Sequence, residues 1–242
     1  MAPTLARCQA IIVPSRFLQT IFARFGITTR VVPNPVDLSR FQRSGPCPDK
    51  TGIDLIITRN LEPIYGIDTA LRAFVTVAER RPDARLWIAG SGPQRRELER
   101  LAEELGIAGK VTFTGRLTPE EIVELYRRAD VLVNPSTVDN SPNALLEALA
   151  AGVPIVSTNA GGIPYLVEHG RTAWLVPVND PEAMARAILA LLQNDGLRSA
   201  LTKAGKRQVQ AHRWDAVKRD LFETYRQAAA REAGCASRME VD

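Results

Sequence analysis

The alternation of two hydrophobic periods most constrains what this chain can fold into. Beyond residue 50, apolar runs of strand length recur between amphipathic stretches of helical period. The runs cover residues 53–58, 85–89, 111–114, 131–134, 153–157 and 173–176. Such alternation is typical of βαβ units, in which helices cover both faces of a parallel sheet. We therefore predict an α/β fold with a doubly wound, Rossmann-like parallel sheet over residues 46–230.

The helical stretches between these runs carry recognisable start signals. Thr118 followed by Pro119 predicts a capped helix start, and Asp180 followed by Pro181 predicts another. The predicted helices cover residues 66–79, 93–105, from 118, from 141, 180–192, 197–209 and 214–229. Together with the six runs, they suffice for one complete doubly wound domain.

The first 45 residues do not fit inside that domain. Residues 10–13, 16–25 and 29–32 form a strand, helix and strand of their own, and the polar, proline-containing stretch 44–50 indicates a linker. A lone βαβ piece cannot bury both faces of its sheet. We interpret residues 1–45 as a short βαβ remnant of a first, N-terminal domain, and residues 231–242 as a flexible tail.

Composition excludes several classes. The chain has 242 residues, 45% of them hydrophobic, without an apolar run of the roughly 18 residues that span a bilayer and without a signal peptide at its start. This predicts a cytoplasmic location, with peripheral contact at the inner membrane face left open. The net charge is +4, but the arginines mostly lie in mixed runs with acids, as on solvated helix faces, so we expect no nucleic-acid partner. Three scattered cysteines and two histidines predict no metal site.

The strongest local constellation runs from residue 134 to residue 147. A strand ends at Asn134, and Ser141 followed by Pro142 is expected to open a helix. The first-turn amides of that helix lack intrahelical acceptors and lie at the positive end of its dipole, so they predict an anion site suited to a diphosphate. These are the amides of Asn143, Ala144 and Leu145.

Two carboxylates flank that anion site. Glu147 lies about one and a half turns into the helix, where it can accept hydrogen bonds from a pair of vicinal hydroxyls. Asp139 lies in the loop before the helix. On the residues alone, the alternative stays open that Asp139 is an ordinary loop residue and Glu147 an ordinary surface residue.

Four sequence blocks resemble the retaining glycosyltransferases of family 4, which have the two-domain GT-B fold. The first block, residues 32–41, is similar to the family's stretch IPNGVD…F, and the second, residues 59–68, to its GRL…KG block. Residues 89–93 are similar to its GxGP turn, and residues 147–164 to its run EAMAxGxPVV…GGxPE. The order and spacing also match. The resemblance implies that residues 46–230 are the C-terminal, donor-binding half of such an enzyme, and that residues 1–45 are the remnant of its N-terminal, acceptor-side domain with the linker.

The resemblance also implies roles for single residues. Glu147 matches the acid that holds the ribose hydroxyls, Asp139 the acid that contacts the donor hexose, and Arg59 the arginine that pairs with the diphosphate. Tyr65 stands where the family usually has a lysine, so it is expected to offer a hydrogen bond without charge, and Tyr165 stands where the family has a glutamate. The remaining donor-binding positions implied are Gly90, Leu117, Gly161 and Gly162.

The function implied is that of the donor-binding part of a glycosyltransferase. It would bind a UDP-, GDP- or ADP-sugar, use no cofactor or metal, and support retaining transfer of the hexose to a sugar or lipid acceptor. The alternative is a non-catalytic nucleotide-sugar-binding module that needs a separate acceptor-domain chain or a homodimer. A nicotinamide site at Gly90-Ser91-Gly92 is disfavoured, because Arg95 stands where the dinucleotide motif requires a third glycine.

Overall fold

The computed structural model describes residues 8–41 and 51–239, with side chains described up to residue 230. Its largest element is a parallel sheet of six strands in the order β5-β4-β3-β6-β7-β8. These strands are β3 (Ile53–Thr58), β4 (Ala84–Ala89), β5 (Val111–Gly115), β6 (Val131–Asn134), β7 (Ile155–Thr158) and β8 (Trp174–Val176). Each overlaps one predicted run, and the predicted fold class is confirmed.

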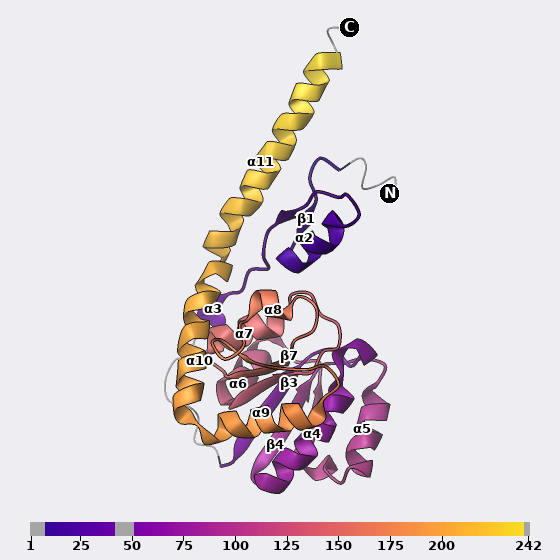
Figure 1. Ribbon diagram of the computed structural model, residues 1–242, viewed down its shortest axis with the longest axis vertical. Coiled ribbons are helices and arrows are strands. Elements are labelled where there is room, and N and C mark those ends of the chain that lie inside the picture. The colour runs from indigo at the N-terminus through magenta and orange to yellow at the C-terminus, as the bar shows by residue number, and fades with distance from the viewer. Residues whose placement is uncertain (1–7, 42–50, 240–242) are drawn as a thin grey trace.

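Helices cover both faces of this sheet, as Figure 1 shows. Side chains of β3 alternate between the two layers, because successive residues of a strand point to opposite faces. Leu55 and Ile57 pack in one core layer with α4, α5 and α9, whereas Ile56 packs in the other with α3, α6 and α7. The helices are α3 (Leu38–Phe41), α4 (Ile67–Arg80), α5 (Arg95–Glu104), α6 (Pro119–Arg128), α7 (Asn143–Ala151), α8 (Ile163–Leu166), α9 (Pro181–Gln193), α10 (Asp195–Gln208) and α11 (Trp214–Met239). Short 3-10 turns occur at η1 (Pro63–Tyr65), η2 (Ala108–Lys110) and η3 (Val209–His212).

Capping chemistry sets several helix starts as predicted. Thr118 and Glu121 form a reciprocal capping box at the start of α6. The Asp180 side chain accepts a hydrogen bond from the backbone N–H of Ala183 at 2.8 Å at the start of α9. The prediction that Ser141 caps α7 is wrong. The N-cap of α7 is Pro142, whose extended backbone delays the first helical residue to Asn143, and the cap makes no side-chain hydrogen bond.

The C-terminal helix is longer than the sequence pattern predicts. We expected it to end near residue 229, but α11 continues to Met239. Alanine, arginine, glutamate and methionine prevail in the extra segment, and all have high helix propensity. In residues 8–41 and 51–239, no helix combines the length and apolar character needed to span a membrane.

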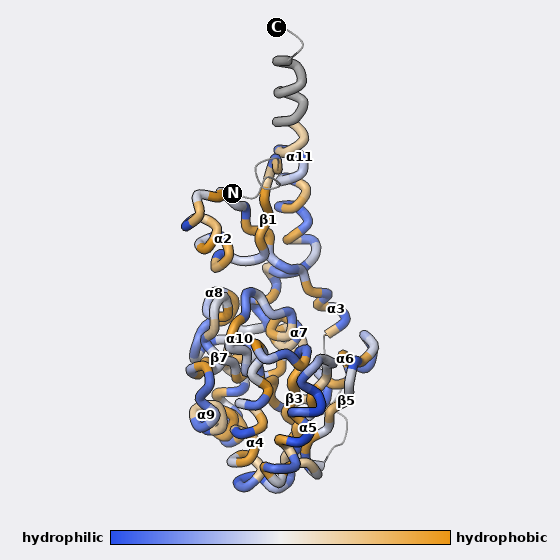
Figure 2. Tube along the Cα trace, turned by 90° about the vertical axis from the view of Figure 1, so that its right-hand side faces the viewer, coloured by the Kyte–Doolittle hydropathy of each residue, from blue (hydrophilic) through white to orange (hydrophobic). Residues whose placement is uncertain are grey.

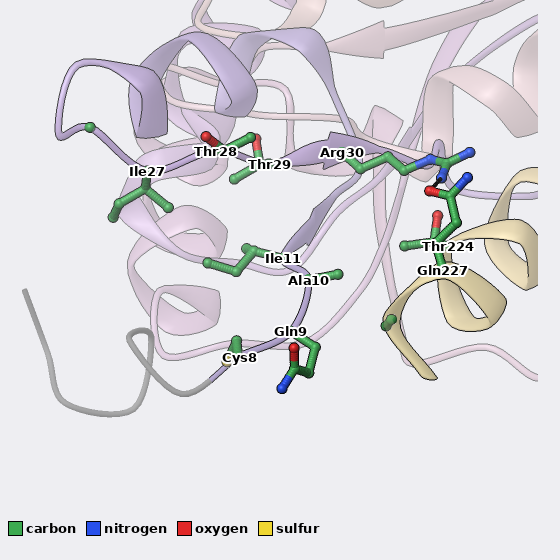
Figure 3. Close-up of a pocket in the computed structure, with 12 residues that line it drawn as sticks. Cys8, Gln9, Ala10, Ile11, Ile27, Thr28, Thr29, Arg30, Thr224 and Gln227 are labelled. Carbon is green, nitrogen blue, oxygen red and sulfur yellow. Dashed lines mark hydrogen bonds between the residues drawn. The ribbon is translucent and has the colours of Figure 1, made fainter. Parts of the chain in front are cut away.

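The N-terminal piece forms a separate small sheet. β1 (Ile12–Val13) and β2 (Arg30–Val31) pair in parallel around α2 (Arg16–Ala23). This piece lies beside α11 and away from α4 and α9 in both views (Figures 1 and 2). Arg30 Nη1 donates a hydrogen bond to Gln227 Oε1 on α11 at 3.0 Å. A pocket of about 380 Å³ lies between the piece and α11, where the side chains of Arg30 and Gln227 point toward each other (Figure 3).

The predicted domain boundaries stay predictions. The linker expected at 44–50 and the boundary between residues 45 and 46 lie outside the described residues. Among the described residues, two segments join the small sheet to the main body. One is the stretch 32–37, in which Val36 N donates a hydrogen bond to His212 O at 2.9 Å. The other is α11, which begins at the main body and runs past the small sheet.

Candidate functional site

The topology of the large sheet marks where a site is expected. β3 and β6 are neighbours although they are not consecutive in the chain, so the winding of the sheet reverses between them. In open parallel sheets, ligands bind outside the carboxyl ends of the strands at such a reversal. Arg59 directly follows β3, and the loop of residues 135–142 follows β6. The two candidate segments therefore meet at the reversal point.

Arg59 and Asp139 form an ion pair at this point. Arg59 Nη2 donates to Asp139 Oδ2, and the two side chains are only 12% and 9% exposed. The Arg59 guanidinium also lies over the ring of Tyr65, with its Cζ atom 4.1 Å from the ring centroid. Arg59 Nε is buried and has no hydrogen-bond partner among the described residues. This nitrogen is therefore a buried donor beside the place where an anion is expected.

Three predicted glycines bring backbone segments close together around this pair. A Cβ atom on Gly162 would lie 1.9 Å from Asn140 O, and one on Gly161 would lie 2.2 Å from Asp139 O. The Gly162 amide donates to Asp139 O at 2.9 Å. Gly90 packs in the same way against the backbone of Arg59, 1.9 Å from its oxygen. Each glycine thus allows a contact with the segment that carries a site residue, since any side chain would overlap backbone.

The start of α7 supplies fewer donors than the sequence predicts. Leu145 N donates to Pro142 O at 3.1 Å, so the prediction that this amide lacks an acceptor is wrong; the late helix start places Pro142 three residues before it. The amides of Asn143 and Ala144 make no backbone hydrogen bond among the described residues. Asn34 reaches the same helix end, where its Nδ2 donates to Asn143 Oδ1 at 3.1 Å.

Glu147 lies on the second turn of α7 and is largely buried. Burial raises the pKa of its carboxyl above the usual value, and this rise is opposed by a hydrogen bond from Tyr126 and by the charges of Arg40 and Arg59. The Tyr126 hydroxyl also lies 2.8 Å from Thr58 Oγ1. Burial raises the pKa of Tyr126 well above its usual value, so this hydroxyl keeps its proton and can donate.

A pocket of about 340 Å³ opens in front of Glu147. Two other predicted residues line it with Glu147, namely Leu117 and Asn143. The remaining lining residues are Pro35, Val36, Asp37, Arg40, Phe41, Pro119, Ile122 and Leu146. Sequence reasoning did not assign residues 35–41 or Tyr126 to the site. The first resembling block contains residues 35–41, but the resemblance implied no binding role for them.

The structure thus divides the predicted residues between two adjacent places. Arg59, Tyr65, Asp139 and Gly90 gather at the reversal point, with Gly161 and Gly162 behind Asp139. Leu117, Asn143 and Glu147 line the pocket. Among the described residues, no three histidine, cysteine, aspartate or glutamate side chains lie together as metal ligands would.

The sequence profile of the family described as glycosyl transferases group 1 matches residues 40–208. The match covers more than half of the chain and includes every site residue named above except Asn34 and residues 35–39. The chain belongs to this family.

Relatives with curated names agree. The chain is 36% identical over 173 residues to a D-inositol 3-phosphate glycosyltransferase of Corynebacterium urealyticum, covering 69% of this chain and 41% of that protein. It is 32% identical over 210 residues to a GDP-mannose-dependent alpha-(1-6)-phosphatidylinositol monomannoside mannosyltransferase of Mycobacterium tuberculosis, covering 82% of this chain and 53% of that protein. The chain therefore spans about half the length of the curated relatives it matches.

Solved structures confirm the GT-B glycosyltransferase fold. Sucrose-phosphate synthase from Thermosynechococcus elongatus superimposes with a TM-score of 0.81 at 27% identity, covering 91% of this chain and 58% of that chain. The Anabaena HepE protein in complex with UDP and glucose superimposes with a TM-score of 0.81 at 21% identity, covering 90% of this chain and 62% of that chain.

Proposed function

We propose that this chain is the donor-binding part of a family 4 glycosyltransferase, which binds a nucleoside-diphosphate sugar and supports retaining transfer of its hexose. The diphosphate lies between Arg59 and the first turn of α7, and the ribose hydroxyls bind Glu147. The base enters the pocket beside Leu117, and the hexose lies near Asp139 and the Gly161-Gly162 turn. One observation carries the proposal: a buried arginine nitrogen without a partner lies at the same sheet reversal as two helix-end amides without backbone acceptors.

The chemistry of this site suits a leaving group that gains charge. As the bond between the sugar and the phosphate breaks, negative charge builds on the diphosphate, and fixed donors stabilise it. The guanidinium of Arg59 offers a planar fork that matches phosphate oxygens, and the α7 amides add the positive end of a helix dipole. The Tyr126 hydroxyl, which donates to the Ala144 carbonyl oxygen at 3.1 Å, also lowers the pKa of the Glu147 carboxyl and so favours the carboxylate that a ribose needs.

The names of similar proteins support the same class of donor. One relative is named as GDP-mannose-dependent, and the HepE structures hold UDP or UDP-glucose. We accordingly propose a UDP-, GDP- or ADP-sugar as donor and a sugar or lipid acceptor. The relative named for phosphatidylinositol monomannoside also suggests peripheral contact with a membrane surface.

Calorimetry on the full chain tests the donor site. UDP, GDP and ADP are titrated into the wild type and into Glu147→Gln, and the nucleotide that binds is then tested as its sugar derivative. The proposal expects one nucleotide to bind the wild type and to bind the variant more weakly. Equal binding to both proteins, or no binding to the wild type, would contradict it.

A second candidate function is a nucleotide-sugar-binding module without catalysis of its own. It is suggested by the small N-terminal sheet, which has two strands, β1 and β2, in the described part of the chain. Such a module would work with a second chain or a homodimer that supplies the acceptor side. Donor binding without hydrolysis or transfer, followed by turnover when a separate acceptor-domain chain is added, would separate the module from the enzyme.

A further inference from the structure

The Arg59 guanidinium lies over the aromatic face of Tyr65. The distance from Arg59 Cζ to the ring centroid is 4.1 Å, within the range in which an aromatic ring attracts a cation. Among the hydrogen bonds of the described residues, none joins the Tyr65 hydroxyl to Arg59, so the contact is one of ring and cation. The ring itself is partly buried and packs on the core layer formed by α4, α5 and α9.

This contact leaves N–H groups of the guanidinium for an incoming anion. The Tyr65 ring takes up none of them, Nη2 is turned to Asp139, and Nε is buried without a hydrogen-bond partner among the described residues. A guanidinium binds phosphate oxygens through N–H groups in its own plane. A ring that fixes the plane therefore fixes the direction in which Arg59 can bind a diphosphate.

The turn that carries Tyr65 is itself tied to the loop that carries Asp139. The Ile64 carbonyl oxygen accepts hydrogen bonds from Thr137 N at 2.9 Å, Thr137 Oγ1 at 3.1 Å and Val138 N at 3.3 Å. Tyr65 N donates to Glu62 O at 3.0 Å within η1. The turn with Tyr65 and the loop with Asp139 thus form one hydrogen-bonded unit. This unit restricts the position of the Arg59 guanidinium through the Tyr65 ring and through the Asp139 carboxylate.

We propose that Tyr65 is a positioning residue, whose ring holds the Arg59 guanidinium in the plane that receives the donor diphosphate. The inference rests on the proposed donor site and differs from the role expected from the sequence, in which the Tyr65 hydroxyl offers a hydrogen bond to the diphosphate. The ring face is the active part, and the hydroxyl is dispensable. Losing the ring removes a partly desolvated cation–π contact, which corresponds to an affinity loss of about 5- to 30-fold.

Two substitutions separate the ring from the hydroxyl. Tyr65→Phe keeps the aromatic face and removes the O–H, whereas Tyr65→Leu keeps an apolar side chain and removes the face. Calorimetry measures the affinity of each full-length variant for UDP, GDP and ADP, and for the matching nucleosides uridine, guanosine and adenosine. We expect Tyr65→Phe to bind the preferred diphosphate like the wild type, and Tyr65→Leu to bind it about 5- to 30-fold more weakly. Nucleoside affinity should be the same in all three proteins.

Controls make each outcome informative. Tyr225→Leu makes the same change at an exposed tyrosine on α11, outside the proposed site, so it should leave diphosphate affinity unchanged. Equal losses in Tyr65→Phe and Tyr65→Leu would assign the contact to the hydroxyl and overturn the proposal, as would wild-type affinity in Tyr65→Leu. An equal loss of nucleoside affinity in Tyr65→Leu would mean a general collapse of the site and would also overturn it. A wild type that binds no nucleoside diphosphate would contradict the proposed function itself.

Discussion

The guanidinium of Arg59, directly after β3, is paired with the carboxylate of Asp139, in the loop after β6. The resemblance to family 4 gives these two residues different parts of the donor, the diphosphate for Arg59 and the hexose for Asp139. In the structure each is the partner of the other. A donor that uses both must exchange this ion pair for two separate contacts, so diphosphate binding and hexose binding are coupled through it.

Asp139→Asn should uncouple them. The neutral amide competes less strongly for Arg59, so affinity for the bare nucleoside diphosphate should rise by about 3- to 10-fold, while the additional affinity contributed by the hexose should fall. Asp139→Glu, which restores the family's usual residue, keeps the charge and serves as the control. Calorimetry with the diphosphate and its sugar derivative measures both effects. A variant that loses affinity for both ligands equally would contradict the coupling.

Glu147→Gln should weaken nucleotide binding and at the same time stabilise the fold. Loss of a charged hydrogen-bond acceptor for the ribose should weaken binding by about 10- to 150-fold. The raised pKa of Glu147 means that the folded state favours the protonated carboxyl. Its stabilising contribution is therefore full below the ordinary glutamate pKa and is lost as the pH rises through the folded value. The variant lacks this pH-dependent loss.

Denaturant unfolding of Glu147→Gln and the wild type at several pH values checks the second half of that prediction. The difference in unfolding free energy should be smallest in acid and should grow in favour of the variant toward neutral pH. A difference that does not change with pH would mean that the pKa of Glu147 is the same in the folded and unfolded chains.

Tyr126→Phe should move the acid limit of nucleotide binding to higher pH. The Tyr126 hydroxyl is the first of the contacts that hold the pKa of Glu147 down against burial, so its removal raises that pKa further. Binding requires the carboxylate and should be lost at a higher pH in the variant than in the wild type. Nucleotide affinity measured from neutral pH into acid gives the two midpoints. Coincident midpoints would show that Tyr126 does not act on Glu147.

Sequence reasoning predicted the sheet well and singled out Arg59, because both rest on local signals. The buried strand 53–58 is an unbroken apolar run, and Arg59 follows it directly in a recognisable block. The contact between Arg59 and Tyr65 has no such signal. The two residues are six positions apart in the chain and do not share a helix. The ring lies next to the guanidinium because the chain turns at Gly66, which has a left-handed backbone, and because Ile64 is hydrogen-bonded to the loop after β6.

The pocket wall shows the same limit. Phe41 meets Tyr126 edge-on, with ring centroids 5.5 Å apart, although the two residues lie far apart in the chain. Neither residue carries a motif for nucleotide binding, so no pattern could assign them. The predicted start of α7 was wrong for another reason. Serine is a favoured N-cap residue, but the backbone of Pro142 is extended, so the helix begins one residue later than predicted.

Gly162→Ala should damage the site and the fold together. The new Cβ would lie 1.9 Å from Asn140 O, so the loop that carries Asp139 must move. Overpacking against backbone costs about 1–3 kcal/mol of unfolding free energy, and the displaced loop should also weaken donor-sugar binding. Gly109→Ala is the matched control, since a Cβ there meets nothing within 4 Å. Wild-type stability in Gly162→Ala would show that the two loops are not in tight contact.

The small N-terminal sheet should be the least protected part of the described chain. It has two strands, its helix α2 contains no buried residue, and Phe25 is 73% exposed. Its ties to the rest are few: Ser15 donates to Asn140, Phe17 contacts Tyr165 with ring centroids 6.1 Å apart, and Arg30 bonds Gln227. Few buried apolar contacts mean a low free energy of local opening.

Hydrogen exchange on the full chain, with its mass measured by light scattering, tests this expectation. Amides of β1 and β2 should exchange at least about tenfold faster than those of β3, because each 1.4 kcal/mol of local stability changes the rate tenfold. Self-association offers the other way to cover these apolar surfaces, and it would appear as a mass above that of one chain. A monomer in which β1 and β2 are as protected as Ile53–Thr58 would mean that the small sheet already has its full set of packing partners, and residues 1–45 would then not be the remnant of a separate domain.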